Sequence, residues 1–301
     1  MAQRIVRVTC PDRPGLVSTI TTAFADRGMN ILTLDQFTDG DALPQTGSPV
    51  HGASGGSFFF RAVVESPAER TPDDAAANAE FHRLQERLTN SVDESTVDIQ
   101  PHPSRLRVVV LASTTDHCLV EMIRRSQTGQ LAGEVVTVVA HHDTHRALCE
   151  FHGIPYVFVP HTDMSREEHE AAVLEAIGTD VDVIVLARYM RILSDDFLQK
   201  APAPIINIHH SFLPSFIGAN PYQRAHDRGV KMIGATAHYV TADLDEGPII
   251  EQDVVRVDHR HTKDQLVQSG ADVERNVLYR AVRAHCEGRI FLDGDRTVVF
   301  G

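Results

Sequence analysis

Four short runs of aliphatic and β-branched residues in the last two thirds of the chain constrain its fold most. They read LRVVVLAS, EVVTVVAHH, VDVIVLAR and APIINIHH, at residues 106–113, 134–142, 181–188 and 203–210. Helical patterns separate them, and strands buried on both faces have this composition. The sequence therefore predicts an α/β domain with an open, mostly parallel, doubly wound sheet. Two later runs, 234–240 and 247–257, have no helix between them and predict an antiparallel pair. A helix over 264–288 and a short strand at 296–300 follow.

The first third of the chain has a different order of predicted elements. Strands are expected at 4–9, 29–39, 57–65 and 95–102, helices at 16–28 and 73–90, and a long hairpin loop from Gly40 to Gly56. The order β-α-β-β-α-β is that of a ferredoxin-like unit. The Pro-His-Pro-Ser segment at 101–104 is expected to be a linker. We therefore expect one domain of residues 1–101 and a second of residues 105–301.

The loop before the first predicted helix has the features of an anion-binding turn. Gly15 lets the chain turn into the helix, whose free N–H groups can hold a carboxylate, and Asp12 and Arg13 lie in the same loop. This segment and the element order resemble those of ACT domains. The resemblance implies a regulatory module that binds a small effector, with an amino acid as the first expectation, at Asp12, Arg13 and Gly15. It also implies pairing between subunits, and so a homo-oligomer.

Charge and cysteine content exclude several classes of protein. The formal net charge is −13, with 28 Lys and Arg against 41 Asp and Glu, whereas binding to nucleic acid or to an acidic membrane needs a basic surface. The four cysteines show no CxxC zinc pattern and no disulfide framework. No stretch approaches the roughly 20 apolar residues that span a bilayer. We expect a cytoplasmic protein with reduced thiols that binds neither nucleic acid nor membrane.

Three polar residues form the candidate reactive centre. Asn207 and His209 stand two positions apart at the end of an apolar strand, so they point to the same face, at the edge where open α/β sheets bind ligands. Asp245 lies in the turn-like Leu-Asp-Glu-Gly between the two antiparallel strands. An Asn amide can stabilise an oxyanion, and His moves protons near neutral pH. The set predicts attack on a carbonyl-type carbon by water or an amine, with Asp245 and His209 titrating together near neutrality.

The motifs around these residues resemble the core of folate-dependent formyltransferases. The matching residues are Asn207-Ile208-His209, Ser211, Leu213 to Phe216, Gly218, Gly234 to Thr236, His238 and Leu244 to Gly247. The resemblance implies that Asn207, His209 and Asp245 are catalytic. It implies a folate pocket at the matching segment from Arg188 to Leu193, where Met190, Arg191, Ile192 and Leu193 hold the pterin ring, with His238 beside Asp245. It also implies that a folate is the substrate and that neither a metal nor another cofactor is needed.

The sequence of the loop after the first strand of the second domain distinguishes between subgroups of these enzymes. Ribonucleotide formyltransferases of this kind cradle a phosphate in a glycine-rich loop, whereas residues 112–119, Ala-Ser-Thr-Thr-Asp-His-Cys-Leu, contain no glycine. The Asp-His-Cys-Leu run and the fused ACT-like domain are similar to formyltetrahydrofolate deformylases, over the whole chain. That resemblance implies hydrolysis of 10-formyltetrahydrofolate to tetrahydrofolate and formate, in one-carbon metabolism and purine biosynthesis.

Two alternatives stay open at the level of sequence. The first is a folate-dependent formyltransferase that passes the formyl group to an amine acceptor, because the same three reactive residues would suit that reaction equally well. An ACT-type amino-acid or folate sensor without turnover is an alternative of another class. Among the other polar residues, His141, His142 and His145 are expected at the surface or lining the pocket, and not on a metal. Cys118 is expected to pack in its helix.

Overall fold

The computed structural model describes residues 3–39, 56–66, 75–213 and 221–301. The chain divides into two compact units, Met1–Ser104 with Phe300–Gly301, and Arg105–Val299. Nearly all of the expected loop from Gly40 to Gly56 lies outside the described residues. So do residues 214–220 of the formyltransferase-like motif.

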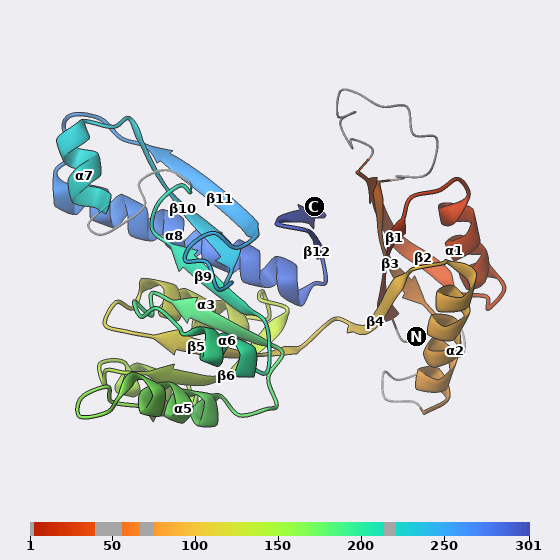
Figure 1. Ribbon diagram of the computed structural model, residues 1–301, viewed down its shortest axis with the longest axis horizontal. Helices are drawn as coiled ribbons and strands as arrows, with labels where there is room; N and C mark the ends of the chain where they lie inside the picture. The colour runs from red at the N-terminus through yellow and green to blue at the C-terminus, as the bar shows by residue number, and fades with distance from the viewer. Residues whose placement is uncertain (1–2, 40–55, 67–74, 214–220) are drawn as a thin grey trace. The chain divides into compact units, whose positions relative to one another are not determined.

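The first unit is a four-stranded antiparallel sheet with two helices. Its elements are β1 (Gln3–Pro11), α1 (Leu16–Ala25), β2 (Asn30–Thr38), β3 (Ser57–Glu65), α2 (Ala75–Ser91) and β4 (Thr96–His102), and the strand order is β2-β3-β1-β4. Both helices cover one face of the sheet, over a core that includes Phe24, Phe60 and Leu84 (Figure 1). The expected ferredoxin-like βαββαβ unit is confirmed.

The strand predicted at 95–102 is confirmed through His102, so the linker expected at residues 101–104 is shorter than predicted. Pro101 and His102 continue β4 and stand opposite Arg4 and Gln3 of β1. A proline is compatible with this place because β4 is an edge strand, where a residue without an N–H need not interrupt a ladder. The connection to the second unit therefore begins only at Pro103.

The second unit is a seven-stranded sheet with helices on both faces (Figure 1). Its strands, in the order they lie in the sheet, are β11 (Ile249–Arg256), β10 (Met232–Tyr239), β9 (Ile205–His209), β8 (Val183–Ala187), β5 (Leu106–Ala112), β6 (Gly133–Ala140) and β7 (Tyr156–Phe158). The five neighbouring strands β9, β8, β5, β6 and β7 run parallel to one another. Strand β10 is antiparallel to both β9 and β11. The expected doubly wound sheet and antiparallel pair are confirmed.

Two short elements were not expected. The three-residue strand β7 extends the parallel sheet beyond β6. The second is β12 (Ile290–Asp293). It forms an antiparallel hairpin with β13 (Arg296–Val299), which is the strand predicted at the end of the chain.

The helices of the second unit divide between the two faces of the sheet. They are α3 (His117–Gln127), α4 (Arg146–Phe151), α5 (Arg166–Ile177), α6 (Asp195–Lys200), α7 (Pro221–Arg228) and α8 (Lys263–Cys286). Side chains alternate along a strand, so Val108 and Val110 pack with α3 and α8, while Val109 and Leu111 pack with α5 and α6. No helix in the described ranges is both long and apolar enough to cross a bilayer.

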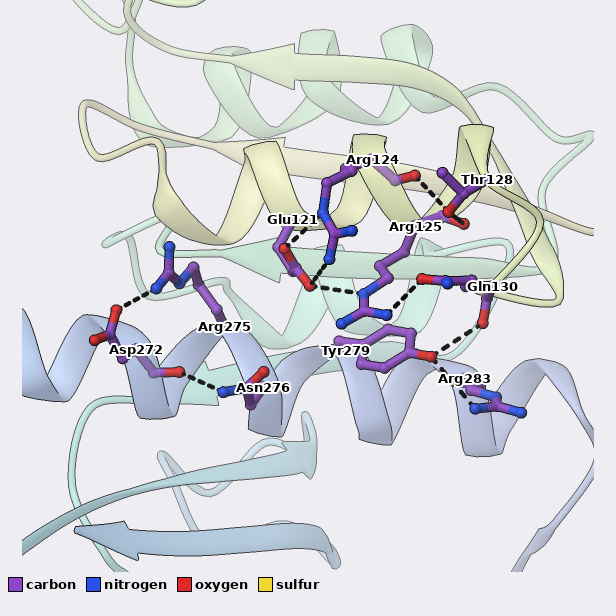
Figure 2. A network of polar contacts seen from close by, with 10 residues as sticks. All are labelled: Glu121, Arg124, Arg125, Thr128, Gln130, Asp272, Arg275, Asn276, Tyr279 and Arg283. Atoms are coloured by element: carbon purple, nitrogen blue, oxygen red, sulfur yellow. Dashed lines mark hydrogen bonds and ion pairs between the residues drawn. The ribbon is translucent and has the colours of Figure 1, made fainter.

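A polar network fixes α8 alongside α3 (Figure 2). Glu121 on α3 accepts hydrogen bonds from Arg124 and Arg125. The guanidinium of Arg125 lies 4.0 Å from the ring centroid of Tyr279 on α8, and the Tyr279 hydroxyl donates to the backbone oxygen of Gln130. A cation over an aromatic ring contributes about 0.5–2 kcal/mol. These contacts fix the position of α8 along the length of α3, and so determine which residues of the two helices face each other.

The strand order reverses between β5 and β8. From β5 the chain moves outward to β6 and β7, and then returns to the other side of β5 as β8 and β9. At such a reversal the loops at the carboxyl ends of the strands leave in opposite directions and open a crevice. The segment after β8, from Arg188 onward, and the end of β9 lie at this edge.

Candidate active site

A cavity of about 330 Å³ opens at the carboxyl ends of β8 and β9. Its lining includes residues 188–193 after β8, residues 207–210 at the end of β9, His238 on β10 and residues 240–245 of the following turn. This volume is at the low end for a site that holds one small organic ligand, roughly 300–1,000 Å³. The structure therefore brings Asn207, His209 and Asp245 into one pocket with all four residues expected to hold the pterin.

His209 and Asp245 form the closest charged pair of this pocket. His209 Nδ1 lies 3.2 Å from Asp245 Oδ2, and both side chains are largely buried. His209 ends β9, whereas Asp245 comes from the turn between β10 and β11, so two loops at the same sheet edge meet here. The other ring nitrogen of His209, Nε2, is buried and has no hydrogen-bond partner in the described part of the chain. It is the atom of this pair that remains available to a ligand.

Asn207 and His238 stand opposite each other on β9 and β10. His238 Nδ1 is 2.9 Å from the carbonyl oxygen of Tyr239, which can only accept, so Nδ1 carries the proton. In neutral His238 the other nitrogen, Nε2, then accepts from Asn207 Nδ2 at 3.2 Å. That bond uses one N–H of the Asn207 amide and leaves the second for a ligand. His238 Nε2 also lies 3.7 Å from Asp245 Oδ1, beside the carboxylate as the resemblance implies.

The carboxyl group of Asp245 is strongly acidified. The hydrogen bond from His209 lowers its pKa far below the usual range, against the opposing effect of burial. Asp245 is therefore a carboxylate at every physiological pH. The expectation that it titrates near neutrality together with His209 is not met by this geometry, because a carboxylate so stabilised is a weak base. Its chemical uses here are to orient water and to hold the His209 ring through Nδ1.

Other histidines lie deeper than the sequence suggested. The ring of His210 stacks on that of His209, with centroids 5.1 Å apart, and burial lowers the His210 pKa to about 4. His141 is 7% exposed and His145 6% exposed, so a surface position is wrong for both. His141 lies against Tyr189 and receives or donates a 3.2 Å hydrogen bond with Ser113. Burial also lowers the His141 pKa to about 4.

These two histidines should make stability depend on pH. Their pKa in the unfolded chain is near 6.5 and in the folded chain about 4, so unfolding binds protons between these values. The contribution of these two histidines to the free energy of unfolding is expected to be fully present above pH 6.5. It should be lost progressively as the pH is lowered toward 4. Denaturant midpoints at several pH values measure this. His141→Gln should flatten the curve, whereas His259→Gln, at an exposed position, should leave its slope unchanged; equal slopes in all three proteins would contradict the assignment.

Three of the six non-glycine residues with positive φ in the described part of the chain line the pocket. Arg188, Met190 and Asp245 all adopt positive φ, at 60°, 61° and 59°. Each such residue other than glycine costs on the order of 1–3 kcal/mol and persists only where surrounding structure enforces it. Strained residues cluster at functional sites because they hold side chains in fixed directions. The pocket is therefore shaped before a ligand arrives.

Gly247 sets the turn that carries Asp245. A Cβ at this position would overlap the backbone oxygen of Tyr239, which cannot move away because it also accepts from His238. Gly247→Ala is expected to lower the free energy of unfolding by about 1–3 kcal/mol or more and to reduce turnover by displacing Asp245. Thermal unfolding and kcat measure the two effects. Glu246→Ala, at an exposed position of the same turn, is the control and should behave as wild type.

The expected effector residues lie in the first unit, at the start of α1. Gly15 precedes this helix with φ 90°, a left-handed conformation that suits glycine. Arg13 is not free, because it lies 3.2 Å from Asp93 and donates to the backbone oxygen of Ser91. The backbone N–H of Asp12 is bonded to the oxygen of Gly56. The loop has the expected turn, with its arginine already engaged by the chain itself.

The sequence reasoning missed one part of the pocket wall. Residues 240–244 form the wall next to Asp245, and their place just before that acidic turn could have suggested this role. Arg188 begins the segment that the resemblance assigned to the folate pocket, and it does line the pocket. Its positive φ was not predictable, because arginine rarely adopts that conformation.

Comparison with known proteins assigns both units. Residues 106–282 match the formyl transferase family, and residues 4–67 match the ACT domain. A formyltetrahydrofolate deformylase of Mycobacterium bovis is 46% identical over 294 residues, covering 97% of this chain and 88% of the relative. One from Escherichia coli K12 is 39% identical over 300 residues, 99% of each chain. The chain belongs to the formyltetrahydrofolate deformylase family.

Solved structures separate the deformylase family from its transferase relatives. The crystal structure of a formyltetrahydrofolate deformylase from Pseudomonas syringae pv. tomato has a TM-score of 0.87 and 38% identity, and covers 100% of this chain and 95% of that chain. Glycinamide ribonucleotide transformylase 1 from Symbiobacterium toebii has a TM-score of 0.62 and 31% identity. It covers 65% of this chain and 95% of its own length. The transformylase shares only part of the architecture, whereas the deformylase shares all of it.

Proposed function

We propose that this protein hydrolyses 10-formyltetrahydrofolate to tetrahydrofolate and formate. The single observation that carries the proposal is the convergence of Asn207, His209 and Asp245 in a pocket walled by residues 188–193, in a chain similar over its whole length to formyltetrahydrofolate deformylases. Turnover needs a group that stabilises an oxyanion, a proton donor and a group that directs water. The pocket offers one of each.

The pterin end of the folate is placed against Met190, Arg191, Ile192 and Leu193, which puts the formyl group beside the three reactive residues. Water, oriented by the Asp245 carboxylate, adds to the formyl carbon. The free N–H of Asn207 donates to the oxygen that becomes negative. His209 Nε2 gives a proton to the departing folate nitrogen and takes up the proton that the attacking water loses, so the imidazole ends the cycle as it began it. The carbon–nitrogen bond breaks, and formate and tetrahydrofolate leave.

The division of roles follows from the geometry. Asn207 is held by His238, so its remaining N–H has a fixed direction, and one such donor is worth about 10²–10³ in rate. His209 is held at Nδ1 by Asp245, so its Nε2 faces the ligand. The resemblance and this donor set imply that no metal takes part, and a turnover assay in the presence of a chelator tests that expectation.

An assay without acceptor tests the function directly. Purified protein is mixed with 10-formyltetrahydrofolate alone, and formate and tetrahydrofolate are measured over time. Equal release of the two products is the expected result. Silence that an added amine relieves would instead indicate the transferase alternative, and tight folate binding without turnover would indicate a sensor.

The first unit is proposed to regulate this reaction as an ACT domain. Its match to that family supports a small-molecule effector, and the turn at Gly15 supports an anionic group such as an amino-acid carboxylate. Repeating the acceptor-free assay with glycine and with methionine tests this. Pairing through this unit into a homo-oligomer is supported by exposed apolar residues Leu32, Leu34 and Phe37 on the edge strand β2, and light scattering of the whole chain tests it.

A further inference from the structure

A buried cluster of charged and polar groups lies next to the reactive pocket and has no part in the mechanism above. Its centre is Glu274 on α8, whose side chain is 2% exposed. One carboxylate oxygen accepts from His117 Nε2 at 2.8 Å, and the other accepts from the Tyr222 hydroxyl at 2.6 Å. The third partner is Arg188, with Nε 3.6 Å from the carboxylate. Burial raises the Glu274 pKa, but the three partners outweigh it and lower the pKa overall, so the group is ionised.

Arg188 joins this cluster to the pocket. It belongs to the pocket lining together with Asn207, His209 and Asp245, yet its side chain is only 14% exposed. Its Nε and Nη1 are buried and have no hydrogen-bond partner in the described ranges. Its backbone has φ 60°, a conformation that glycine adopts more readily. An arginine at a glycine-like position is kept there for what its side chain does.

The surrounding chain is built to keep Glu274 in place. Gly270 lies one helical turn before Glu274, and a Cβ there would overlap the Tyr222 hydroxyl, so only glycine lets Tyr222 reach the carboxylate. His117 begins α3, which the contacts around Tyr279 hold against α8. Four elements thus converge to fix one carboxylate, and that carboxylate fixes the guanidinium of Arg188.

The position of Arg188 bears on which nucleophile enters. Formyl transfer to an amine needs space beside the reactive residues for a second organic substrate, whereas hydrolysis needs space for one water. The cavity has about 330 Å³, which suits one small ligand. We propose that Arg188, anchored by Glu274, fills the acceptor side of the pocket and so restricts the attacking group to water. This inference rests on the proposed function, and it assigns Arg188 and Glu274 as residues that determine specificity.

The two reactions differ only in the attacking atom. In hydrolysis the water oxygen bonds to the formyl carbon, the bond from carbon to the folate nitrogen breaks, that nitrogen gains a proton, and formate leaves. In transfer an amine nitrogen bonds to the carbon, the same bond breaks, and the proton lost by the amine balances the one gained by the folate. The ratio of formylated amine to formate therefore measures the selectivity of the site, independent of how much enzyme is active.

The experiment measures that ratio with glycinamide as a small primary amine. Wild-type protein is expected to give formate equal to tetrahydrofolate at every glycinamide concentration. Arg188→Gly removes the side chain at a backbone position that glycine favours. It should produce N-formylglycinamide in proportion to the amine, at a ratio to formate about tenfold or more above the upper limit measured for wild type, the scale on which one wall of a pocket discriminates. Release of formate alone by Arg188→Gly would overturn the proposal.

Two further variants distinguish the effect of the bulk of the Arg188 side chain from the effect of its charge, and a third guards against a failure to fold. Arg188→Met retains most of the bulk without the charge and should keep formate as the only formyl product at whatever rate it turns over; transfer as strong as in Arg188→Gly would overturn the filling role. Glu274→Gln keeps the shape but releases the guanidinium and should give an intermediate ratio. If Arg188→Gly is unfolded by circular dichroism, Arg188→Ala replaces it. Loss of all turnover in a folded variant of either kind would make Arg188 catalytic and also overturn the proposal.

Failure of the proposed function is recognised separately. Wild-type protein that releases no formate without an acceptor would refute hydrolysis, whatever the variants do. A hydrolytic wild type with an unchanged product ratio in Arg188→Gly would refute the specificity role alone. Reactions without enzyme give the background formylation of glycinamide, which is subtracted from each ratio.

Discussion

Replacing Asp245 with asparagine is expected to lower kcat by about 10²–10⁴-fold. The amide keeps the shape of the side chain but removes the negative charge that His209 and His238 both face at 3.2 and 3.7 Å. Without that charge, His209 loses the anionic partner of its Nδ1 and water loses the carboxylate that orients it. Binding of the folate should change little, because the pterin contacts lie on another segment of the pocket.

The measurement is steady-state hydrolysis with saturating 10-formyltetrahydrofolate. Asp264→Asn makes the same chemical change at an exposed position in the first turn of α8, outside the pocket lining, where the side chain pairs with neither histidine among the described residues. It should leave kcat near the wild-type value. Turnover by Asp245→Asn comparable to that of this control would remove Asp245 from the chemistry.

Asn207→Ala is expected to lower kcat by about 10²–10³-fold with little change in KM. The N–H that remains after the bond to His238 is aimed where the oxyanion develops, and the ground-state carbonyl needs it less. Asn207→Asp, which keeps the size and loses the donor, should be equally impaired. The control is Asn276→Ala on α8, whose amide bonds only to the backbone of Asp272 among the described contacts (Figure 2). A raised KM with unchanged kcat would assign Asn207 to substrate binding instead.

The sheet and the meeting of the reactive residues were accessible from sequence for a physical reason. Buried parallel strands have a composition that few other elements share, so β5, β6, β8 and β9 could be placed without a structure. Asn207 and His209 stand at i and i+2 on a strand, which fixes their common face. The place of Asp245 could be predicted because it lies in the turn between two predicted strands that have no helix between them.

What the sequence did not indicate depends on long-range contacts. The pairing of Arg188 with Glu274 joins residues far apart in the chain and rests on a backbone conformation that no local pattern requires. The strong acidity of Asp245 comes first from the hydrogen bond of His209, which lies at the end of another strand, so the residue type alone could not reveal it. The burial of His141 depends on how the end of β6 packs against Tyr189.

The antiparallel alignment of β9 and β10 limits how this site can change in evolution. Asn207 faces His238 and His209 faces Thr236, so a shift of one residue along either strand would turn the reactive groups to the opposite side of the sheet. Single-residue insertions or deletions within these strands should therefore abolish function even where the protein still folds. A bulge at Ala237 and His238 lies in the pairing of β10 with β11, on the other side of β10. Length changes should therefore be tolerated first in β11, where the alignment is already irregular, and last in the five residues of β9.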